Sequence, residues 1–229
     1  MQRRAALLLA FVIAFGFAAL AALPRPELPQ DRALARAAPG DGPLAMTVLG
    51  TSLARRAIWP DLFAQSLGEC LGREVRVTRV ARAGANSRWG LAEAEGVAAA
   101  VPDLVLIEFA LADADLVDGV WPGESRENHH AIIAAIRDVR PEARIVLMTT
   151  NPVGGLHRLK RVALGIYYEG YRALAAELGT GLLDAWPRWP GTEAIADGVH
   201  PDPGAEARIV VAPLLALVAP GFGADCTGP

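Results

Sequence analysis

The chain has 229 residues, of which 52% are hydrophobic and 21% charged, with a formal net charge of -3 at pH 7. This composition excludes an intrinsically disordered chain, which would be poorer in apolar residues and carry a larger net charge. It also lacks the basic stripe with interleaved aromatic residues that a nucleic-acid-binding surface needs, so no nucleic-acid partner is expected. The length suits one globular domain with a sizeable core.

The N-terminal segment resembles an export or anchor signal. Arg3 and Arg4 precede an uncharged apolar run over residues 5–23, which ends at Pro24. Its length lies between that of a cleaved signal peptide and that of a short membrane-spanning helix, so both alternatives remain open. In either case the basic end stays inside, and the rest of the chain is expected in an extracytoplasmic compartment, periplasmic or secreted, with the membrane as a partner of the segment.

Residues 24–43 are rich in Pro, Ala, Gly and Arg and lack a sustained apolar period. This pattern is typical of a linker. We therefore expect three parts: a signal peptide or signal anchor over 1–23, a linker over 24–43 and one folded domain over 44–229.

Within the domain, short aliphatic and β-branched runs alternate with longer segments of helical period. The predicted strands are residues 45–49, 74–80, 104–109, 144–149 and 181–184. The predicted helices are residues 60–71, 87–100, 127–139, 160–178 and 204–218. The alternation predicts an α/β fold: a three-layer α/β/α doubly wound sheet of about five parallel strands, preceded by an N-terminal hydrophobic helix. No glycine-rich phosphate-binding run is present, so no nucleotide cofactor is expected.

Cys70 and Cys226 are the only cysteines in the sequence. Neither lies in a C-x-x-C spacing with a histidine nearby, so no metal site is expected. An extracytoplasmic compartment would permit a disulfide between them. Two unpaired thiols are the alternative.

Candidate catalytic residues lie where the predicted strands end, which is the edge at which open parallel sheets bind ligands. Ser52 follows the first strand, and Gly50 before it permits a tight turn. The next helix begins close to Ser52. The backbone N–H of Ser52 is therefore expected to point outward and to help hold an oxyanion. Taken alone, this arrangement is also that of an ordinary turn or helix cap.

A base for this serine is found by elimination among the four histidines. His129 and His130 fall inside a predicted helix and His157 in a loop, and all three are expected at the solvated surface. His200 follows the fifth strand, with Asp197 three residues before it. The carboxylate can then fix the imidazole tautomer and leave the other nitrogen free to accept the serine proton.

Four segments occur in a characteristic order at the strand ends: residues 50–53 (GTSL), 81–87 (ARAGANS), 107–113 (IEFALAD) and 197–201 (DGVHP). With these segments the chain resembles the SGNH/GDSL hydrolase family, from about residue 44 to 218. The resemblance implies a flavodoxin-like sheet, hydrolysis or transfer of acyl groups on oxygen esters, and no metal or organic cofactor. By position it implies that Ser52 is the nucleophile, His200 the base, Asp197 the orienting acid and Gly84 an oxyanion-hole donor.

The third segment departs from the family pattern. Ala112 stands where an asparagine usually completes the oxyanion hole, and Ala110 stands where a glycine is usual. Asn86 and Asn151 are the candidate substitute donors, although Asn86 also fits a turn or N-cap. Two functions remain open. One is a serine esterase or O-acyltransferase acting on small acyl groups of envelope saccharides or lipids; the other is a catalytically weakened relative that binds acylated glycan or serves in assembly.

Overall fold

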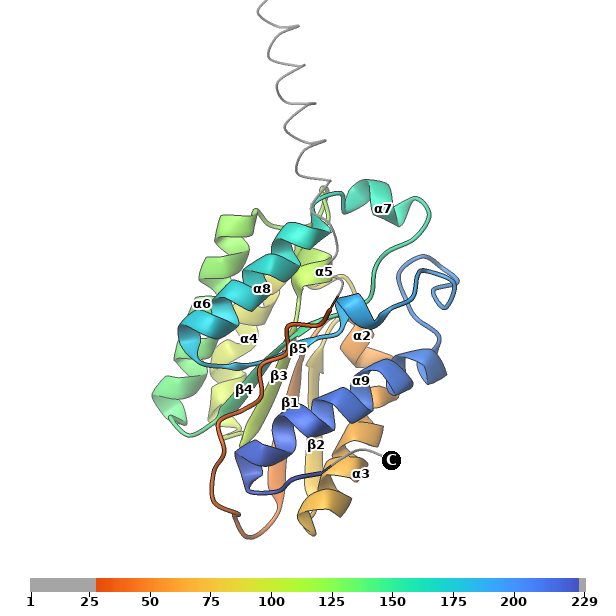
Figure 1. Cartoon of the computed structure of the whole chain (residues 1–229). Helices are drawn as coiled ribbons and strands as arrows, with labels where there is room; N and C mark the ends of the chain where they lie inside the picture. Colours follow the sequence, from red (N-terminus) through yellow and green to blue (C-terminus); the bar gives the residue numbers. More distant parts are fainter. Residues whose placement is uncertain (1–27, 227–229) are drawn as a thin grey trace, which may run out of the picture.

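The computed structural model describes residues 28–226, shown in Figure 1. Its centre is a parallel five-stranded sheet in the order β2-β1-β3-β4-β5. The strands are β1 (Leu44–Gly50), β2 (Val75–Ala81), β3 (Leu104–Glu108), β4 (Arg144–Thr149) and β5 (Gly181–Asp184). The chain moves outward from β1 to β2 and then returns to the other side of β1, so the strand order reverses between β1 and β3. That reversal is where such sheets form their ligand-binding crevice.

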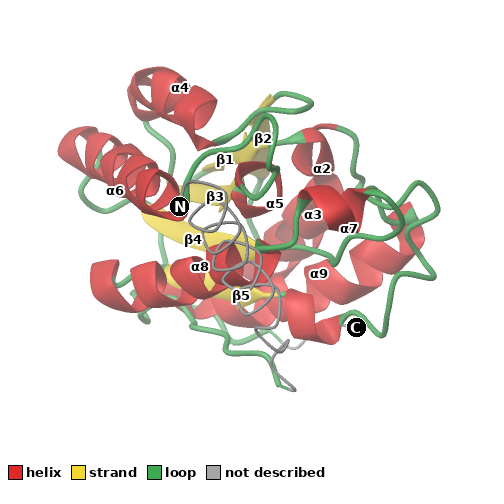
Figure 2. Ribbon diagram, turned by 90° about the horizontal axis from the view of Figure 1, so that it is seen from above, coloured by secondary structure: helices red, strands yellow, loops and turns green. Residues whose placement is uncertain are grey.

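Helices cover both faces of the sheet, as Figure 2 shows in a view from above. One face carries α4 (Ser87–Ala99), α6 (Pro122–Val139) and α8 (Leu164–Leu178), and the other carries α3 (Trp59–Leu71) and α9 (Pro203–Val218). Shorter turns of helix fill the connections: α2 (Ser52–Arg55), α5 (Ala110–Asp113), α7 (His157–Lys160), η1 (Trp186–Arg188) and η2 (Ala219–Phe222). The predicted three-layer doubly wound fold with five parallel strands is confirmed.

Two hydrophobic cores follow from the alternation of side chains along the strands. On β3, Val105 and Ile107 pack beneath α4, α6 and α8, whereas Leu104 and Leu106 pack beneath α3 and α9. All five residues of β3 are buried. This central strand is therefore apolar on both faces, as expected of a parallel sheet covered on both sides.

Two helix boundaries differ from the prediction. α6 begins at Pro122, five residues earlier than expected, since proline suits the first turn of a helix. The helix predicted over 160–178 begins only at Leu164, as α8, and Lys160 is instead the last residue of the short α7. The carbonyl of Lys160 accepts a hydrogen bond from Leu116 N at 2.8 Å instead of continuing the helix.

The described part of the predicted linker, residues 28–43, lies against the domain. Arg32 pairs with Leu182 of β5 through two backbone hydrogen bonds, and the buried Leu34 donates its N–H to Leu217 O in α9. Asp31 forms a salt bridge with Arg188. Residues 31–34 are therefore part of the folded domain and not of a linker. They pair with β5, and Leu34 fills a space between β5 and α9. The predicted signal segment and N-terminal hydrophobic helix lie outside the described residues.

Within the described residues, 203–222 is a helical segment long and apolar enough to cross a membrane, by composition alone. Half of its apolar window is buried inside the domain, where α9 contacts α3 and β5. Packing of this kind is that of a core helix. A disulfide between Cys70, in the last turn of α3, and Cys226 closes the same face, with the two Cα atoms 6.1 Å apart.

Candidate active site

Ser52 lies at the carboxyl end of β1, as the first residue of α2. The turn before it is held by Glu108 at the end of β3. The Glu108 carboxyl accepts hydrogen bonds from Thr51 N at 2.5 Å and from Thr51 Oγ1 at 3.0 Å. A Cβ at Gly50 would overlap this carboxyl. Glycine is therefore required at position 50 by the close approach of Glu108, and not by the positive φ of a tight turn.

A continuous chain of hydrogen bonds joins Ser52, His200 and Asp197. His200 Nε2 lies 2.8 Å from Ser52 Oγ, and His200 Nδ1 lies 2.7 Å from Asp197 Oδ2. Because a carboxylate can only accept, Nδ1 carries the imidazole proton and Nε2 is left to accept the serine hydroxyl. The structure thus brings Ser52 together with His200 and Asp197, although Ser52 and His200 are 148 positions apart in the sequence.

The Asp197 carboxylate is fixed by its own loop. Its Oδ1 accepts hydrogen bonds from His200 N at 2.7 Å and Val199 N at 2.9 Å, in a turn where Gly198 has a φ of 81°. The His200 backbone N–H, then its side chain, then the Val199 N–H hold the pKa of Asp197 well below its usual range. Asp197 therefore stays ionised across the pH range in which histidine titrates.

Two backbone N–H groups that follow the ends of β1 and β2 are free of protein acceptors in the described structure. Within residues 28–226, neither Ser52 N nor Gly84 N donates to a protein acceptor. Gly84 is exposed and has a φ of 71°, a conformation that favours glycine. Free backbone donors at the edge that carries a nucleophile are what an oxyanion hole requires.

The two candidate substitute donors are otherwise engaged. Asn151 Nδ2 donates to Val199 O and to Pro152 O, both at 2.8 Å, and so holds the loop that carries His200. Asn86 caps α4 by accepting from Arg88 N at 3.1 Å, and its Nδ2 donates to Asp118 O at 2.8 Å. Neither amide is therefore placed as a free replacement for the missing family asparagine. Position 112, in α5, presents only a methyl group.

Restoring the absent donor should speed the reaction. We expect Ala112→Asn to raise kcat on a short-chain aryl acetate by up to about 10²-fold, since one oxyanion-hole donor typically contributes about 10²- to 10³-fold. The apolar variant Ala112→Leu, of similar side-chain size, is the control and should give no gain. Steady-state kinetics decides; an equal or lower kcat in the asparagine variant would count against a missing donor.

Sequence patterns do not reveal two buried acids near the start of α2. Glu108 and Glu206 line one small cavity next to Leu53, together with Asn151 and Trp189. Burial raises the pKa of Glu108 to about 8, against the lowering effect of its hydrogen bonds to Thr51. Burial, then the nearby Glu108, raises the pKa of Glu206 to about 8 as well. The only available signal was the polar residue ending an otherwise apolar strand at Glu108.

These raised pKa values predict how stability changes with pH. Between the ordinary carboxyl value of 4.5 and about 8, the folded state holds a Glu206 proton that the unfolded chain has lost. The free energy of unfolding therefore falls as the pH rises through this window. Glu206→Gln, which stays neutral, should stabilise the protein most near pH 8 and little near about pH 5. Thermal unfolding of both proteins across this range measures the difference; a constant difference would contradict the buried acid.

The expectation of a solvated His129 is wrong. His129 is 1% exposed, and its ring lies between Ser125 O, 2.6 Å from Nδ1, and Tyr171 Oη, 2.7 Å from Nε2. Burial lowers the pKa of His129, so the ring is neutral. Nδ1 then donates to the carbonyl and Nε2 accepts from Tyr171, whose oxygen in turn accepts from Phe109 N at 2.8 Å. This chain of bonds fixes the backbone after β3, on which position 112 depends.

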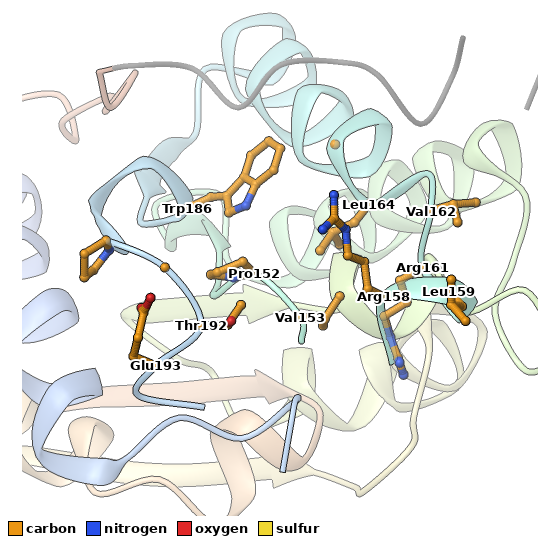
Figure 3. Close-up of a pocket in the computed structure, with 13 residues that line it drawn as sticks. Pro152, Val153, Arg158, Leu159, Arg161, Val162, Leu164, Trp186, Thr192 and Glu193 are labelled. Carbon is orange, nitrogen blue, oxygen red and sulfur yellow. The ribbon is translucent and has the colours of Figure 1, made fainter. Parts of the chain in front are cut away.

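A cavity of about 720 Å³, shown in Figure 3, has Thr192 and Glu193 in its wall, a few residues before Asp197 and His200 in the chain. Trp186, Pro152 and Val153 form apolar parts of its wall. Thr192, Glu193 and Arg158 contribute polar groups. Gly154, which follows the lining residue Val153, donates its N–H to Gly198 O at 2.8 Å, in the loop that carries Asp197 and His200. Ser52, Asp197 and His200 themselves do not line the cavity.

An open parallel sheet that carries a hydrogen-bonded serine, histidine and aspartate at its ligand-binding edge is the architecture of a serine hydrolase. Comparison with known proteins gives the family. The model of the GDSL-like Lipase/Acylhydrolase family matches residues 39–208. The chain therefore belongs to the GDSL-like lipase/acylhydrolase family, whose members hydrolyse esters.

Solved structures show the same fold at low sequence identity. A catalytic mutant of the acetylxylan esterase Axe2 from Geobacillus stearothermophilus is 19% identical, with a TM-score of 0.66 over 85% of this chain and 99% of that one. A lipase/acylhydrolase from Enterococcus faecalis is 21% identical, with a TM-score of 0.66 over 75% and 93%. TesA is 23% identical, with a TM-score of 0.59 over 72% and 93%. No curated protein matches the sequence.

Proposed function

We propose that this protein is a serine esterase that removes small acyl groups from oxygen esters through a covalent acyl-enzyme. The observation that carries the proposal is the hydrogen-bonded chain from Ser52 Oγ through His200 to Asp197. Ser52 Oγ attacks the ester carbonyl while His200 Nε2 takes its proton, and the same proton passes to the leaving alkoxide. Water then attacks the acyl-enzyme, again with His200 as base, and releases the acid and free Ser52.

The oxyanion of each tetrahedral intermediate would be held by the backbone N–H groups of Ser52 and Gly84. Both are free in the described structure, and both are fixed by rigid neighbours, α2 and the turn before α4. The methyl group of Ala112 adds no third donor. We therefore expect a working but slow enzyme, and a sugar hydroxyl in place of water would make the same residues an O-acyltransferase.

For the substrate we propose an acylated saccharide or lipid of the cell envelope. The apolar run over residues 5–23 supports export to an extracytoplasmic compartment, with cleavage and anchoring both open. The disulfide between Cys70 and Cys226 suits that compartment. The cavity with its indole wall and polar groups can hold a sugar ring, and one structural neighbour is an acetylxylan esterase.

A fluorophosphonate probe tests the proposal because it reacts only with an activated serine. We expect labelling of the folded protein, hydrolysis of a short-chain aryl acetate, and loss of both in Ser52→Ala. Ser66→Ala, which removes a half-buried hydroxyl on α3, away from the site, controls for general effects on folding. The competing function, motivated by Ala112, is a weakened relative that binds acylated glycan or serves in assembly. Well-folded protein without any labelling would favour that alternative.

A further inference from the structure

Four large apolar side chains stand exposed at the edge of the sheet that carries the site. Leu116 and Val117 follow α5 and are 55% and 72% exposed. Leu156, just before α7, is 78% exposed, and Leu159, within α7, is 66% exposed. We call these four residues the apolar rim. Figure 1 shows α5 and α7 at the same end of the molecule. Exposed apolar side chains gathered in one place mark an interaction surface.

The apolar rim belongs to one rigid unit. Leu116 N donates to Lys160 O at 2.8 Å, which joins the two loops directly. Arg161 strengthens the junction by a hydrogen bond to Leu111 O and a salt bridge to Asp115, each at 2.9 Å. The rim is therefore held in place although its side chains have little cover.

Basic groups accompany the apolar rim. Arg158 and Lys160 are both exposed and lie on α7 between and beside the two exposed leucines, and α7 contains no acidic residue. Apolar side chains interleaved with cations are the pattern of a segment that enters the interface of an anionic bilayer. Leu159 and Arg158 also line the cavity beside the site, so such a surface would face the mouth of that cavity.

The path of the chain orients the domain in the same way. Gln30 N donates to Asp184 Oδ2 at the carboxyl end of β5, so the described chain begins at the edge that carries the site. The apolar run ends at Leu23, and from there to Leu28 the chain can reach at most about 18 Å when extended. If the run is retained as an anchor, the site edge must therefore lie close to the bilayer.

From these observations we propose that the apolar rim, with Arg158 and Lys160, docks on the surface of an anionic lipid bilayer and presents the active site to esters held in or near its headgroups. This goes beyond the proposed function and rests on it only for the ester substrate. The docking itself requires no catalysis.

The test places an environment-sensitive fluorophore on the full chain reconstituted into vesicles that contain phosphatidylglycerol, with the native disulfide intact. A label at Leu159→Cys should be quenched by nitroxide-bearing lipids, whereas a label at Val139→Cys, exposed at the opposite edge, should not. Arg158→Gln with Lys160→Gln should reduce the quenching. Equal quenching at both positions, or none at Leu159, would overturn the proposal. Self-quenching between copies without lipid quenching would assign the rim to a dimer and overturn it as well.

A kinetic experiment separates docking from chemistry. Val117→Asp with Leu156→Asp, two rim residues that do not line the cavity, should lower kcat/KM on an aryl ester embedded in vesicles by about tenfold and leave that on a water-soluble aryl acetate unchanged. The matched control is Val101→Asp with Val139→Asp, two exposed apolar residues away from the rim. A similar loss in both pairs would speak against docking. If the unaltered protein and both double variants fail to hydrolyse either ester, the proposed function is wrong. The lipid-quenching experiment still decides whether the rim docks on the bilayer.

Discussion

His200→Ala is expected to lower kcat for a short-chain aryl ester by about 10⁵- to 10⁶-fold, and Asp197→Asn by about 10⁴-fold. In the proposed mechanism His200 is the base: its Nε2 lies 2.8 Å from Ser52 Oγ, and among residues 28–226 no other side chain is hydrogen-bonded to that oxygen. Asp197 is proposed only to orient the ring, and an amide in its place would favour the wrong tautomer without removing the base. Single-turnover and steady-state kinetics measure both losses.

The matched control is His130→Ala, which removes a half-exposed imidazole of α6 that lies near Glu177 of α8. It should leave kcat within about twofold, since surface substitutions away from special features have small effects. Activity retained within tenfold in His200→Ala would rule out the proposed mechanism. Equal losses of kcat in His200→Ala and Asp197→Asn would contradict the proposed roles, in which His200 transfers the proton and Asp197 only orients the ring.

Replacing both cysteines by serine should cost the folded protein about 5 kcal/mol. The disulfide joins residues 156 positions apart, and closing so long a loop in the unfolded chain removes much of its conformational entropy. Whole domains of this kind are stable by only about 5–15 kcal/mol, so the change is a large part of the total. The midpoint of thermal unfolding is expected to fall by about 10–20 °C, as followed by circular dichroism.

Adding reductant to the unaltered protein is the control, and it should lower the midpoint by a similar amount. It also keeps the prediction testable if the serine variant does not fold. Reductant should have no effect on the serine variant itself. A midpoint unchanged by reduction would show that α3 and the C-terminal segment hold together without the bond.

Much of the fold could be predicted from the sequence because β1, β3, β4 and β5 are short, mainly apolar runs, β2 alternates apolar and polar residues, and helices such as α3, α6 and α8 have an apolar and a polar face. The predicted strands agree to within one residue with the observed ends of β1, β2 and β3. The hydrogen-bonded group of Ser52, His200 and Asp197 was also accessible, since parallel strands end at one edge and His200 was the histidine left at that edge. Local pattern and sheet topology were enough for these features.

The remaining features depend on contacts that sequence periodicity does not record. His129 lies on a helix with a polar neighbour on each side, so its sequence position suggests an exposed ring. The ring can be buried because Tyr171, from α8, supplies a hydrogen-bond partner for Nε2. Asn86 and Asn151 look like free amides until the acceptors around them are known. The segment from Asp31 to Leu34 lacks a strand pattern, yet it pairs with β5 because the edge of the sheet offers free backbone groups.

The dependence of one sheet face on α9 has a consequence for truncated forms of the protein. This helix supplies much of the cover for the face that it shares with α3. Without residues 203–218, apolar side chains of that face, such as Leu104 and Leu106 of β3, would be bare to water. Loss of α9 would therefore leave an aggregation-prone remnant, not a smaller enzyme.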